Sequence, residues 1–517
     1  MKKIILLISI FLYINFPSIG QNDGKLTKLW ERNTKKERRT SGEFNKIELD
    51  TAAINKLYFS QEKKISITTV DDNDNSIITD LELVPSKPVK VKLNNGSYSN
   101  DIKMPIFYRG KVRGLKGNNQ VLLTISPNYI SFKTILPNTA IVIAQEENTQ
   151  TKSFLQYNSN SLKAKAETFT CGLPAPDASS EKKMQPIIEK SFNQPKAPSD
   201  KTVYVFVDCT KLLFEHNGSN AQATIDYIFS IWNDVKTAFT NEQLNVEISE
   251  INIWTDSTPF NTSTRELGIQ TFAAFYQNNY WGNMAMLLDW NATNAGVAGG
   301  YGWAKGFAPN VCGNYNANPM PSWNHGSYIY NDLNYFGNYQ NFPVPANAEQ
   351  VYSCTHEIGH LLGSYHTHNC GWLLSTNPNV YGALDNCNAP EGTCSPGPTP
   401  TNGGTFMSYC IGAGEYMNFN NGFGAIPGGV IRGFIDGNSC ILNNTSCVFN
   451  NTIGAIPGTG TYLFEATNQL TANGVINGNS STYVKLDAGS RVVLSPGFKA
   501  TNGSKVKVII DGCGGIR

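Results

Sequence analysis

The sequence predicts three domains: a β-rich N-terminal domain, an α/β (α+β) domain with a mixed sheet and a long histidine-bearing helix, and a small all-β C-terminal domain. The 517 residues suffice for about three domains. In the N-terminal third, short segments in which apolar and polar residues alternate are separated by Asn and Gly turns. In the middle of the chain, segments with the periodicity of a strand alternate with segments that have the periodicity of a helix. Short strands return after Cys447. We therefore divide the chain into residues 1–20, 21–197, 198–447 and 448–517.

The first twenty residues have the pattern of a secretory signal peptide. Two lysines precede the apolar run Ile4 to Phe16, and the small residues Ser18 and Gly20 suit cleavage before Gln21. No later stretch reaches the roughly 18 apolar residues that a membrane helix needs. We expect a secreted, extracellular protein, with attachment to the cell surface left open and no membrane insertion of the mature form.

The charge balance argues against a nucleic-acid partner. Forty-one basic and forty acidic side chains give a net charge of +1. A chain without a basic excess lacks the electrostatic surface that attracts phosphate backbones or anionic membranes. Any attraction of a ligand must therefore be local.

The N-terminal domain is predicted from strand-like alternations at Lys64 to Val70, Val121 to Ile125 and Ile130 to Ile135. Residues 174–200 are rich in Pro, Lys and Ser and predict an exposed linker. Lys182-Lys183 in this linker is a candidate cleavage site for a trypsin-like activating protease.

The middle domain is expected to open with a strand, a long helix and a strand. Val203 to Val207 is continuously apolar, as in a strand buried on both faces. Apolar residues then recur at helical spacing. They are Ile225, Ile228, Phe229, Trp232, Val235 and Phe239. From Val246 to Ile253, apolar and polar residues alternate with one interruption, which predicts a strand with a bulge.

Two further strands and a loop precede the histidines. Met284 to Asp289 and the glycine-rich Gly299 to Lys305 have strand character, and Asn314 to Phe342 has the composition of a long loop. Asn347 and Gln350 form a capping-box pattern, which places the start of a helix near Ala348 and its end near Leu362.

That helix carries a predicted zinc site. His356 and His360 are four residues apart, so both imidazoles project from one helix face and can reach one metal. Gly363 can turn the backbone so that His366 becomes a third ligand. Three protein ligands leave one position open, as in catalytic zinc sites. Glu357 beside the metal can accept a proton from water that the metal activates.

His368 is an alternative third ligand, although the position of Gly363 favours His366. The chain has only six histidines, and four of them lie within thirteen residues, which indicates a metal site. His216 and His325 have no suitably spaced partner, and we expect them to be structural or exposed to solvent.

The run from His356 to His366 resembles the H-E-x-x-H-x-x-G-x-x-H motif of the metzincin zinc metalloproteases. The resemblance implies a Met-turn, for which Met407 in Thr-Phe-Met-Ser-Tyr is the candidate. It also implies that Tyr409 either contacts zinc or the transition state, or lines the specificity pocket. Thr367 departs from the Asp of adamalysins and the Glu of astacins, which leaves the subfamily in doubt. The cysteine-rich stretch around the Met-turn favours the adamalysin/reprolysin side.

Cys171 resembles the cysteine switch of metzincin zymogens, in which a propeptide thiolate occupies the open zinc position. It is the only cysteine before residue 200, and it is preceded by a segment with features of adamalysin propeptides, Tyr108 to Gly114. The chain has eleven cysteines, so removal of Cys171 leaves an even number, and we expect those ten to be mostly disulfide-bonded. The alternative is a thiol that pairs with another cysteine or has no role.

The resemblance also implies a substrate rim. The family places an edge strand above the cleft that pairs with extended substrate. In this sequence the corresponding residues are Gly300, Tyr301, Gly302 and Trp303.

The C-terminal domain is predicted from strands at 462–465, 483–486, 491–494 and 505–510. Gly-Ser-Arg-Val at 489–492 recurs as Gly-Ser-Lys-Val fourteen residues later, which suggests stacked strand-turn rungs. The segment resembles the coathanger-stack modules of secreted proteins from Bacteroidetes-type bacteria.

The sequence thus predicts a secreted endopeptidase made as a latent precursor, with one catalytic Zn²⁺, protein or peptide substrates and an activating protease as partner. Calcium binding is left open. The alternatives are a catalytically silent adhesin or toxin that uses the domain for binding, and a zinc hydrolase that acts on other bonds. An intact Glu357 disfavours the silent protein.

Overall fold

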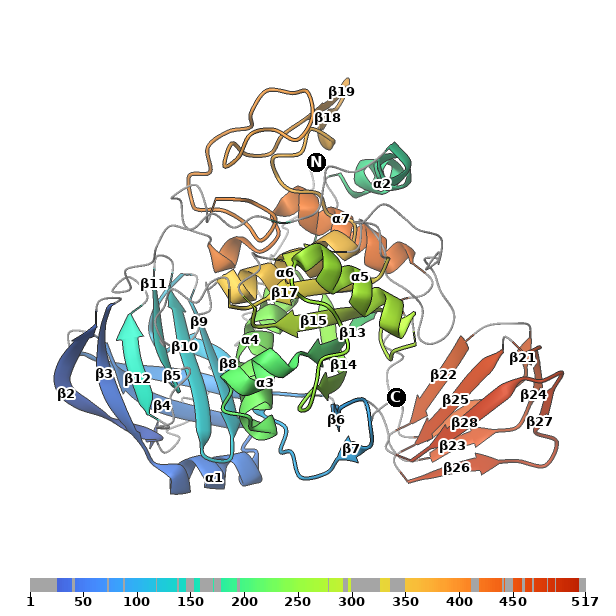
Figure 1. The fold of residues 1–517 in the computed structure, drawn as a ribbon, viewed down its shortest axis with the longest axis horizontal. Helices are drawn as coiled ribbons and strands as arrows, with labels where there is room; N and C mark the ends of the chain where they lie inside the picture. Colours follow the sequence, from blue (N-terminus) through green and yellow to red (C-terminus); the bar gives the residue numbers. More distant parts are fainter. Residues whose placement is uncertain are drawn as a thin grey trace, which may run out of the picture.

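The computed structural model describes residues 26–510, except for short gaps of one to three residues and the following longer ones. The longer gaps are 146–152, 159–170, 172–177, 292–295, 299–325, 335–348, 411–417 and 442–449. Figure 1 shows a blue N-terminal sheet on one side, a central α/β part, and a red C-terminal module on the other side. The proposed signal peptide, His325 and residues 300–303 lie outside the described residues.

The N-terminal part is a ten-stranded sheet in the order β1-β4-β5-β8-β9-β10-β11-β12-β3-β2. Its strands are β1 (Leu26–Thr27), β2 (Trp30–Arg39), β3 (Gly42–Leu49), β4 (Lys64–Val70), β5 (Ser76–Val84), β8 (Ile106–Val112), β9 (Gln120–Ser126), β10 (Tyr129–Leu136), β11 (Thr139–Gln145) and β12 (Phe154–Asn158). Helix α1 (Thr51–Ser60) begins at Asp50, whose carboxylate accepts from the backbone N–H of Ala53. The three strands predicted here are confirmed as β4, β9 and β10.

The expected exposed linker is wrong over residues 178–191, which form helix α2 (Ala178–Ser191). Met184 and Ile188 on this helix are buried, and α2 packs on α7 (Ala425–Gly437). The predicted cleavage site Lys182-Lys183 therefore lies in a helix, where a protease would have to unwind the backbone first. Lys196 lies outside the helix, and its side chain is 51% exposed.

A seven-stranded sheet forms the centre of the molecule, in the order β16-β17-β15-β13-β14-β6-β7. The strands are β6 (Lys90–Leu93), β7 (Tyr98–Ser99), β13 (Thr202–Cys209), β14 (Asn245–Ile253), β15 (Met284–Asp289), β16 (Gly296–Ala298) and β17 (Tyr328–Asp332). β17, β15, β13, β14 and β6 run parallel, whereas β16 and β7 are antiparallel to their neighbours. Helices α3 (Lys211–His216), α4 (Ala221–Asn241), α5 (Arg265–Tyr276) and α6 (Glu349–Leu361) accompany this sheet.

The predicted strand, helix and bulged strand are confirmed. β13 is buried along its whole length, and β14 pairs with it through a register shift that skips Ser249. On α4 the apolar residues face the core, but the polar Asp226, Asn233 and Asp234 are buried as well. They are buried because α4 also packs on the N-terminal strand β9.

The expected long loop at 314–342 is wrong at β17, a buried strand that pairs with β15. The run Tyr328 to Tyr330 is too short to stand out among its polar neighbours, and its burial depends on strands distant in sequence. The predicted rim strand at 299–305 follows directly after β16, and its residues lie outside the described part of the chain.

The hairpin of β6 and β7 comes from the N-terminal segment, yet it extends the central sheet. β6 pairs in parallel with β14, so Lys90 to Leu93 lie beside Glu250 to Ile253. The N-terminal and central parts therefore share hydrogen bonds between strands.

The C-terminal module is a stack of parallel strands arranged in three sheets, β20-β23-β26, β21-β24-β27 and β22-β25-β28. Its strands are β20 (Asn450–Ile453), β21 (Ile456–Pro457), β22 (Thr461–Ala466), β23 (Gln469–Ala472), β24 (Val475–Asn477), β25 (Tyr483–Ala488), β26 (Arg491–Leu494), β27 (Lys499–Thr501) and β28 (Lys505–Ile509). The predicted strands and the stacking are confirmed. The fourteen-residue repeat is not the rung, because paired residues step by 22, from 461 to 483 to 505.

The cysteines differ from expectation. Among the described residues, two disulfides join Cys370 to Cys394 and Cys387 to Cys410. Cys209 and Cys354 are free and buried, so these two are exceptions to the expectation that the ten cysteines besides Cys171 are mostly disulfide-bonded. Both are packed in the central core as small apolar side chains.

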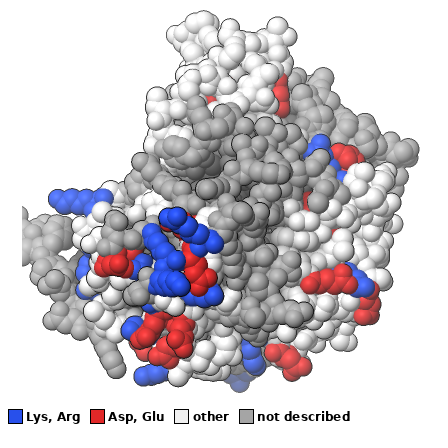
Figure 2. Space-filling model, turned by 60° about the vertical axis from the view of Figure 1, so that its left-hand side comes forward, with Lys and Arg blue, Asp and Glu red and all other residues white. Residues whose placement is uncertain are grey.

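Among the described residues, no helix has the length and apolar character needed to cross a membrane. Basic and acidic side chains are interspersed on the face seen in Figure 2, as the nearly equal totals of 41 and 40 lead one to expect.

Candidate metal centre

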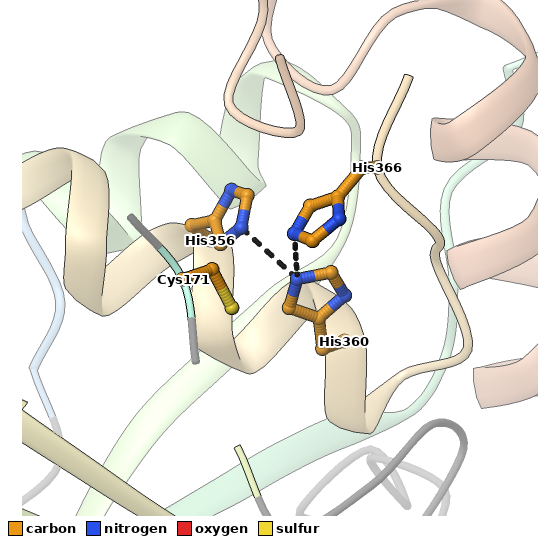
Figure 3. A group of neighbouring side chains, drawn as sticks. All are labelled: Cys171, His356, His360 and His366. Atoms are coloured by element: carbon orange, nitrogen blue, oxygen red, sulfur yellow. Dashed lines mark hydrogen bonds between the residues drawn. The ribbon is translucent and has the colours of Figure 1, made fainter. Parts of the chain in front are cut away.

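Helix α6 brings two histidines to the centre of the molecule. Val351, Ile358 and Leu361 are fully buried and fix α6 against the core. His356 and His360 project from the same side of the helix (Figure 3). Gln350 donates a hydrogen bond to the Leu333 carbonyl, and Asn347 of the predicted capping box lies outside the described residues.

The backbone turns at Gly363, which has a φ of +95°. A side chain is strained in this conformation. A Cβ at this position would also lie 2.4 Å from Cε of Met184 in helix α2. Glycine therefore allows the helix to end, the chain to reverse, and α2 to pack directly on the turn.

After this turn His366 faces the two helical histidines (Figure 3). The Nε2 atom of His360 lies 3.0 Å from that of His356 and 3.1 Å from that of His366. All three side chains are buried. His368, the alternative ligand, instead points its Nε2 at Glu391, 3.2 Å away.

The other ring nitrogen of each histidine has an oxygen partner. Nδ1 of His356 lies 2.6 Å from the Phe406 carbonyl, and Nδ1 of His360 lies 2.7 Å from the Ser364 carbonyl. A carbonyl can only accept, so Nδ1 carries the proton and Nε2 presents a lone pair. Burial and the adjacent imidazoles hold the pKa of His356 and His360 well below the usual value, in the neutral form that binds metals.

These residues fit a zinc ion. Ligand nitrogens 2.0 to 2.1 Å from a tetrahedral metal lie about 3.3 Å apart, close to the separations seen between the Nε2 atoms. Three imidazoles, each oriented by an oxygen at Nδ1, form a donor set typical of zinc sites.

Cys171 and Glu357 border the same space. The sulfur of Cys171 and the three histidine nitrogens lie within 4.8 Å of one another, and Figure 3 shows the thiol pointing toward the imidazoles. The sulfur is also 3.6 Å from Oε2 of Glu357, which is fully buried on α6. One metal could therefore contact the thiol and the histidines at once, with the carboxylate beside it.

Met407 packs against α6 at Gly359. A Cβ on Gly359 would lie 2.6 Å from the Met407 sulfur, so glycine allows this contact. The Met407 carbonyl accepts from the backbone N–H of Thr367 at 2.9 Å, and the Thr367 hydroxyl lies 3.3 Å from the same oxygen. The turn thus supports both the helical ligands and the segment after His366.

Tyr409 lies beside Cys171 and His366. Its hydroxyl accepts from the backbone N–H of Cys171 at 3.0 Å and lies 3.4 Å from Nε2 of His366. Burial, reinforced by the nearby Cys171, raises the pKa of Tyr409 well above its usual value. The phenol is therefore protonated at neutral pH and can donate a hydrogen bond.

Glu391 is a site residue that the sequence analysis missed. Its Oε1 lies 2.5 Å from Nδ1 of His366, and its Oε2 accepts from Asn369 at 3.1 Å. Burial opposes its charge, but hydrogen bonds from His366 and His368 hold the pKa of Glu391 far below its usual value. Glu391 is 25 residues from His366 and belongs to no local motif, so only the folded loop reveals the contact.

The Glu391 loop is tied to the metal centre by covalent and backbone bonds. The Glu391 carbonyl accepts from Cys370, and its N–H donates to the His368 carbonyl at 3.0 Å. Cys370 is bonded to Cys394, three residues beyond Glu391, and Cys387 is bonded to Cys410 beside Tyr409. The loop is thereby held against both the third histidine and the Met-turn.

We predict that Glu391→Ala lowers zinc affinity about 10- to 100-fold, because His366 loses the carboxylate that orients its ring. Glu391→Gln should recover part of this loss, since its amide oxygen still accepts from Nδ1. Competition with a chromogenic chelator measures the affinity. Glu215→Gln, at an exposed carboxylate on α3, serves as the control. An unchanged affinity in Glu391→Ala would exclude a positioning role.

Comparison with known proteins agrees with this geometry. Residues 199–421 match the family model Reprolysin_5, described as metallo-peptidase family M12. The match supports a metzincin-like metallopeptidase domain and agrees with the expected reprolysin side. No curated protein sequence matches the chain.

One similar solved structure is described as "Structure of a chaperone-substrate complex". It is 12% identical with a TM-score of 0.21, and the alignment covers 32% of this chain and 24% of that one. The chain thus spans about a quarter of that structure's length, and a likeness this weak carries no argument.

Proposed function

We propose that this chain is the latent precursor of a secreted zinc endopeptidase that hydrolyses peptide bonds of extracellular proteins. The observation that carries the proposal is the convergence of three histidine nitrogens beside a buried glutamate, in a segment that matches a metallopeptidase family. Zinc bound there would supply a Lewis acid that polarises the scissile carbonyl and activates water.

Glu357 then has two roles. It accepts the proton of the attacking water, and it later passes that proton to the leaving amine. Its position on α6, one residue after His356, places the carboxylate beside the three histidines. His356, His360 and His366 would hold the metal, while Phe406, Ser364 and Glu391 fix their rings.

Latency follows from Cys171 and helix α2. The Cys171 thiol lies with the three histidine nitrogens, where it would take the metal position that a water needs, and the Tyr409 hydroxyl holds the backbone of Cys171 in position. Helix α2 packs on the turn at Gly363. Removal of the segment from 159 to 196 would open the metal centre, with Lys196, whose side chain is 51% exposed, as the cleavage site for an activating protease.

We assign Tyr409 to stabilising the transition state once Cys171 has left, because its hydroxyl then faces the vacated space. Tyr409→Phe should keep its zinc and lower kcat by about 10²-fold, the effect of losing one oxyanion donor. Steady-state kinetics and metal analysis of the activated enzyme test this. Unchanged kcat/KM would leave Tyr409 with a pocket-lining role only.

The chain cut after residue 160 and after Lys196, which frees the segment carrying Cys171 and α2, tests the proposed function. We expect it to cleave a broad peptide library, with products whose masses correspond to peptide-bond hydrolysis. A folded, zinc-loaded chain that cleaves none of the library would instead favour a silent adhesin or toxin, in which the C-terminal stack is the binding element.

A further inference from the structure

The N-terminal segment is built into the central part of the molecule. We propose that residues 26–158 remain bound to the peptidase domain as a non-covalent subunit after activation, and that only the segment carrying Cys171 and α2 leaves. The inference rests on the proposed function in treating the N-terminal segment as part of a precursor. It differs from simple latency because it makes the active enzyme a two-chain complex.

The first observation is the hairpin of β6 and β7. It extends the central sheet beside β14, and side chains reinforce the backbone pairing. Glu250, which is 2% exposed, is 2.8 Å from Nζ of Lys92 and accepts from the Tyr98 hydroxyl at 2.6 Å. Asn94 bonds both the backbone N–H and the hydroxyl of Thr255, each at 2.7 Å. Removal of the hairpin would expose the edge of β14 and leave the buried Glu250 carboxylate without these partners.

The second observation is a shared hydrophobic core. Val91, Phe107, Leu122 and Ile135 of the N-terminal segment are fully or almost fully buried in the same cluster as α4, β13 and α6. The rings of Phe107 and Phe229 are 5.7 Å apart. Separation of the two parts would expose these apolar side chains on both sides, as in obligate complexes whose interfaces resemble a divided domain core.

The third observation is a row of buried polar contacts along α4. Ser126 donates to Asp226 at 2.6 Å, and Asn233 donates to Thr124 at 3.1 Å. Lys133 forms an ion pair with Asp234, and both side chains are at most 2% exposed. Charges paired in this way are strongly destabilised when one partner is removed. The contacts thus favour association over separation.

Retention is compatible with access to the metal centre. The hairpin occupies one edge of the central sheet, while β16, which precedes the proposed rim residues in the sequence, lies at the opposite edge. The inhibitory elements, Cys171 and α2, come after β12 in the chain. The part that blocks the metal and the part that completes the sheet can therefore be separated by cleavage in 159–170 and after Lys196.

The test uses the full chain with recognition sites for a sequence-specific protease inserted after residue 160 and after Lys196. After cleavage, the sample is run on a sizing column at about 1 μM, where complexes with a tighter Kd stay associated. Intact-mass analysis identifies the pieces. We expect the fragments ending at 160 and starting at 197 to co-elute one to one, and the middle fragment to be lost.

Lys133→Ala should increase the dissociation rate of the cut complex at least about tenfold, because it unpairs a buried interfacial charge. The matched control is Lys64→Ala on the same sheet, where both partners of the Lys64–Glu82 pair are 66% exposed. Aggregation of the larger fragment on forced separation would also support the proposal.

An N-terminal fragment that elutes alone, while the larger fragment stays monodisperse and keeps its circular dichroism, would overturn the proposal. Peptidase activity is measured separately on the same sample. A complex that co-elutes but is inactive would contradict the proposed function and leave the retention supported.

Discussion

Glu357→Gln is expected to keep its zinc and to lose peptidase activity by about 10²- to 10⁴-fold, the usual contribution of a general acid–base group. Glu357 lies on α6 directly after His356 and is fully buried beside the metal centre. Glutamine has nearly the same shape, so the helix and the three histidines should stay in place. What is lost is the group that accepts and returns a proton.

The measurement pairs kcat/KM with metal content. Glu391→Gln is the matched control, because it also neutralises a carboxylate at the metal centre, but one that contacts a ligand ring. Added zinc should restore activity to Glu391→Gln and leave Glu357→Gln inactive. If Glu357→Gln cleaves at a rate near wild type, the proton transfer belongs to another residue.

Cys171→Ala should make the uncut precursor active, raising its peptidase activity about a hundredfold or more over the wild-type precursor. A tethered ligand gains this order of occupancy from its high effective concentration, and the variant loses the ligand while keeping the tether. The Cys171 sulfur and the three histidine nitrogens lie within 4.8 Å of one another. The readout is the activity of intact precursor, checked by mass before and after the assay.

Cys209→Ala is the control for this experiment, because Cys209 is a second free thiol, buried in β13. It should leave the precursor latent. A Cys171→Ala precursor as inactive as wild type would mean that α2 or another segment blocks the centre, and Cys171 would then have no role in latency.

Local patterns predicted most of the elements near the metal centre. α6 was predictable because apolar and histidine residues recur at helical spacing, and β13 because its apolar run is continuous. β17 was not, because five residues among Asn, Tyr and Gly become a strand only through pairing with β15. The 22-residue rung could not be predicted, because the two similar tetrapeptides at 489–492 and 503–506 lead into strands of different sheets, β26 and β28.

The residues of the candidate site likewise include some that local spacing predicts and others that only the fold reveals. The three histidines and Glu357 lie within eleven residues, so their spacing alone predicts a shared metal. Glu391 reaches His366 only because two disulfides and backbone bonds fold its loop back. The burial of Asp226 and Asp234 depends on a sheet about a hundred residues earlier, which no helical period can reveal.

Metal removal and replacement on the activated enzyme tests the central claim most directly. The chain cut after residue 160 and after Lys196 is treated with 1,10-phenanthroline, assayed on casein, and then given zinc in stoichiometric steps. The account predicts loss of cleavage with the chelator and full recovery at one zinc per chain, because the three histidines hold a single ion. Cleavage that persists in metal-free enzyme would contradict it.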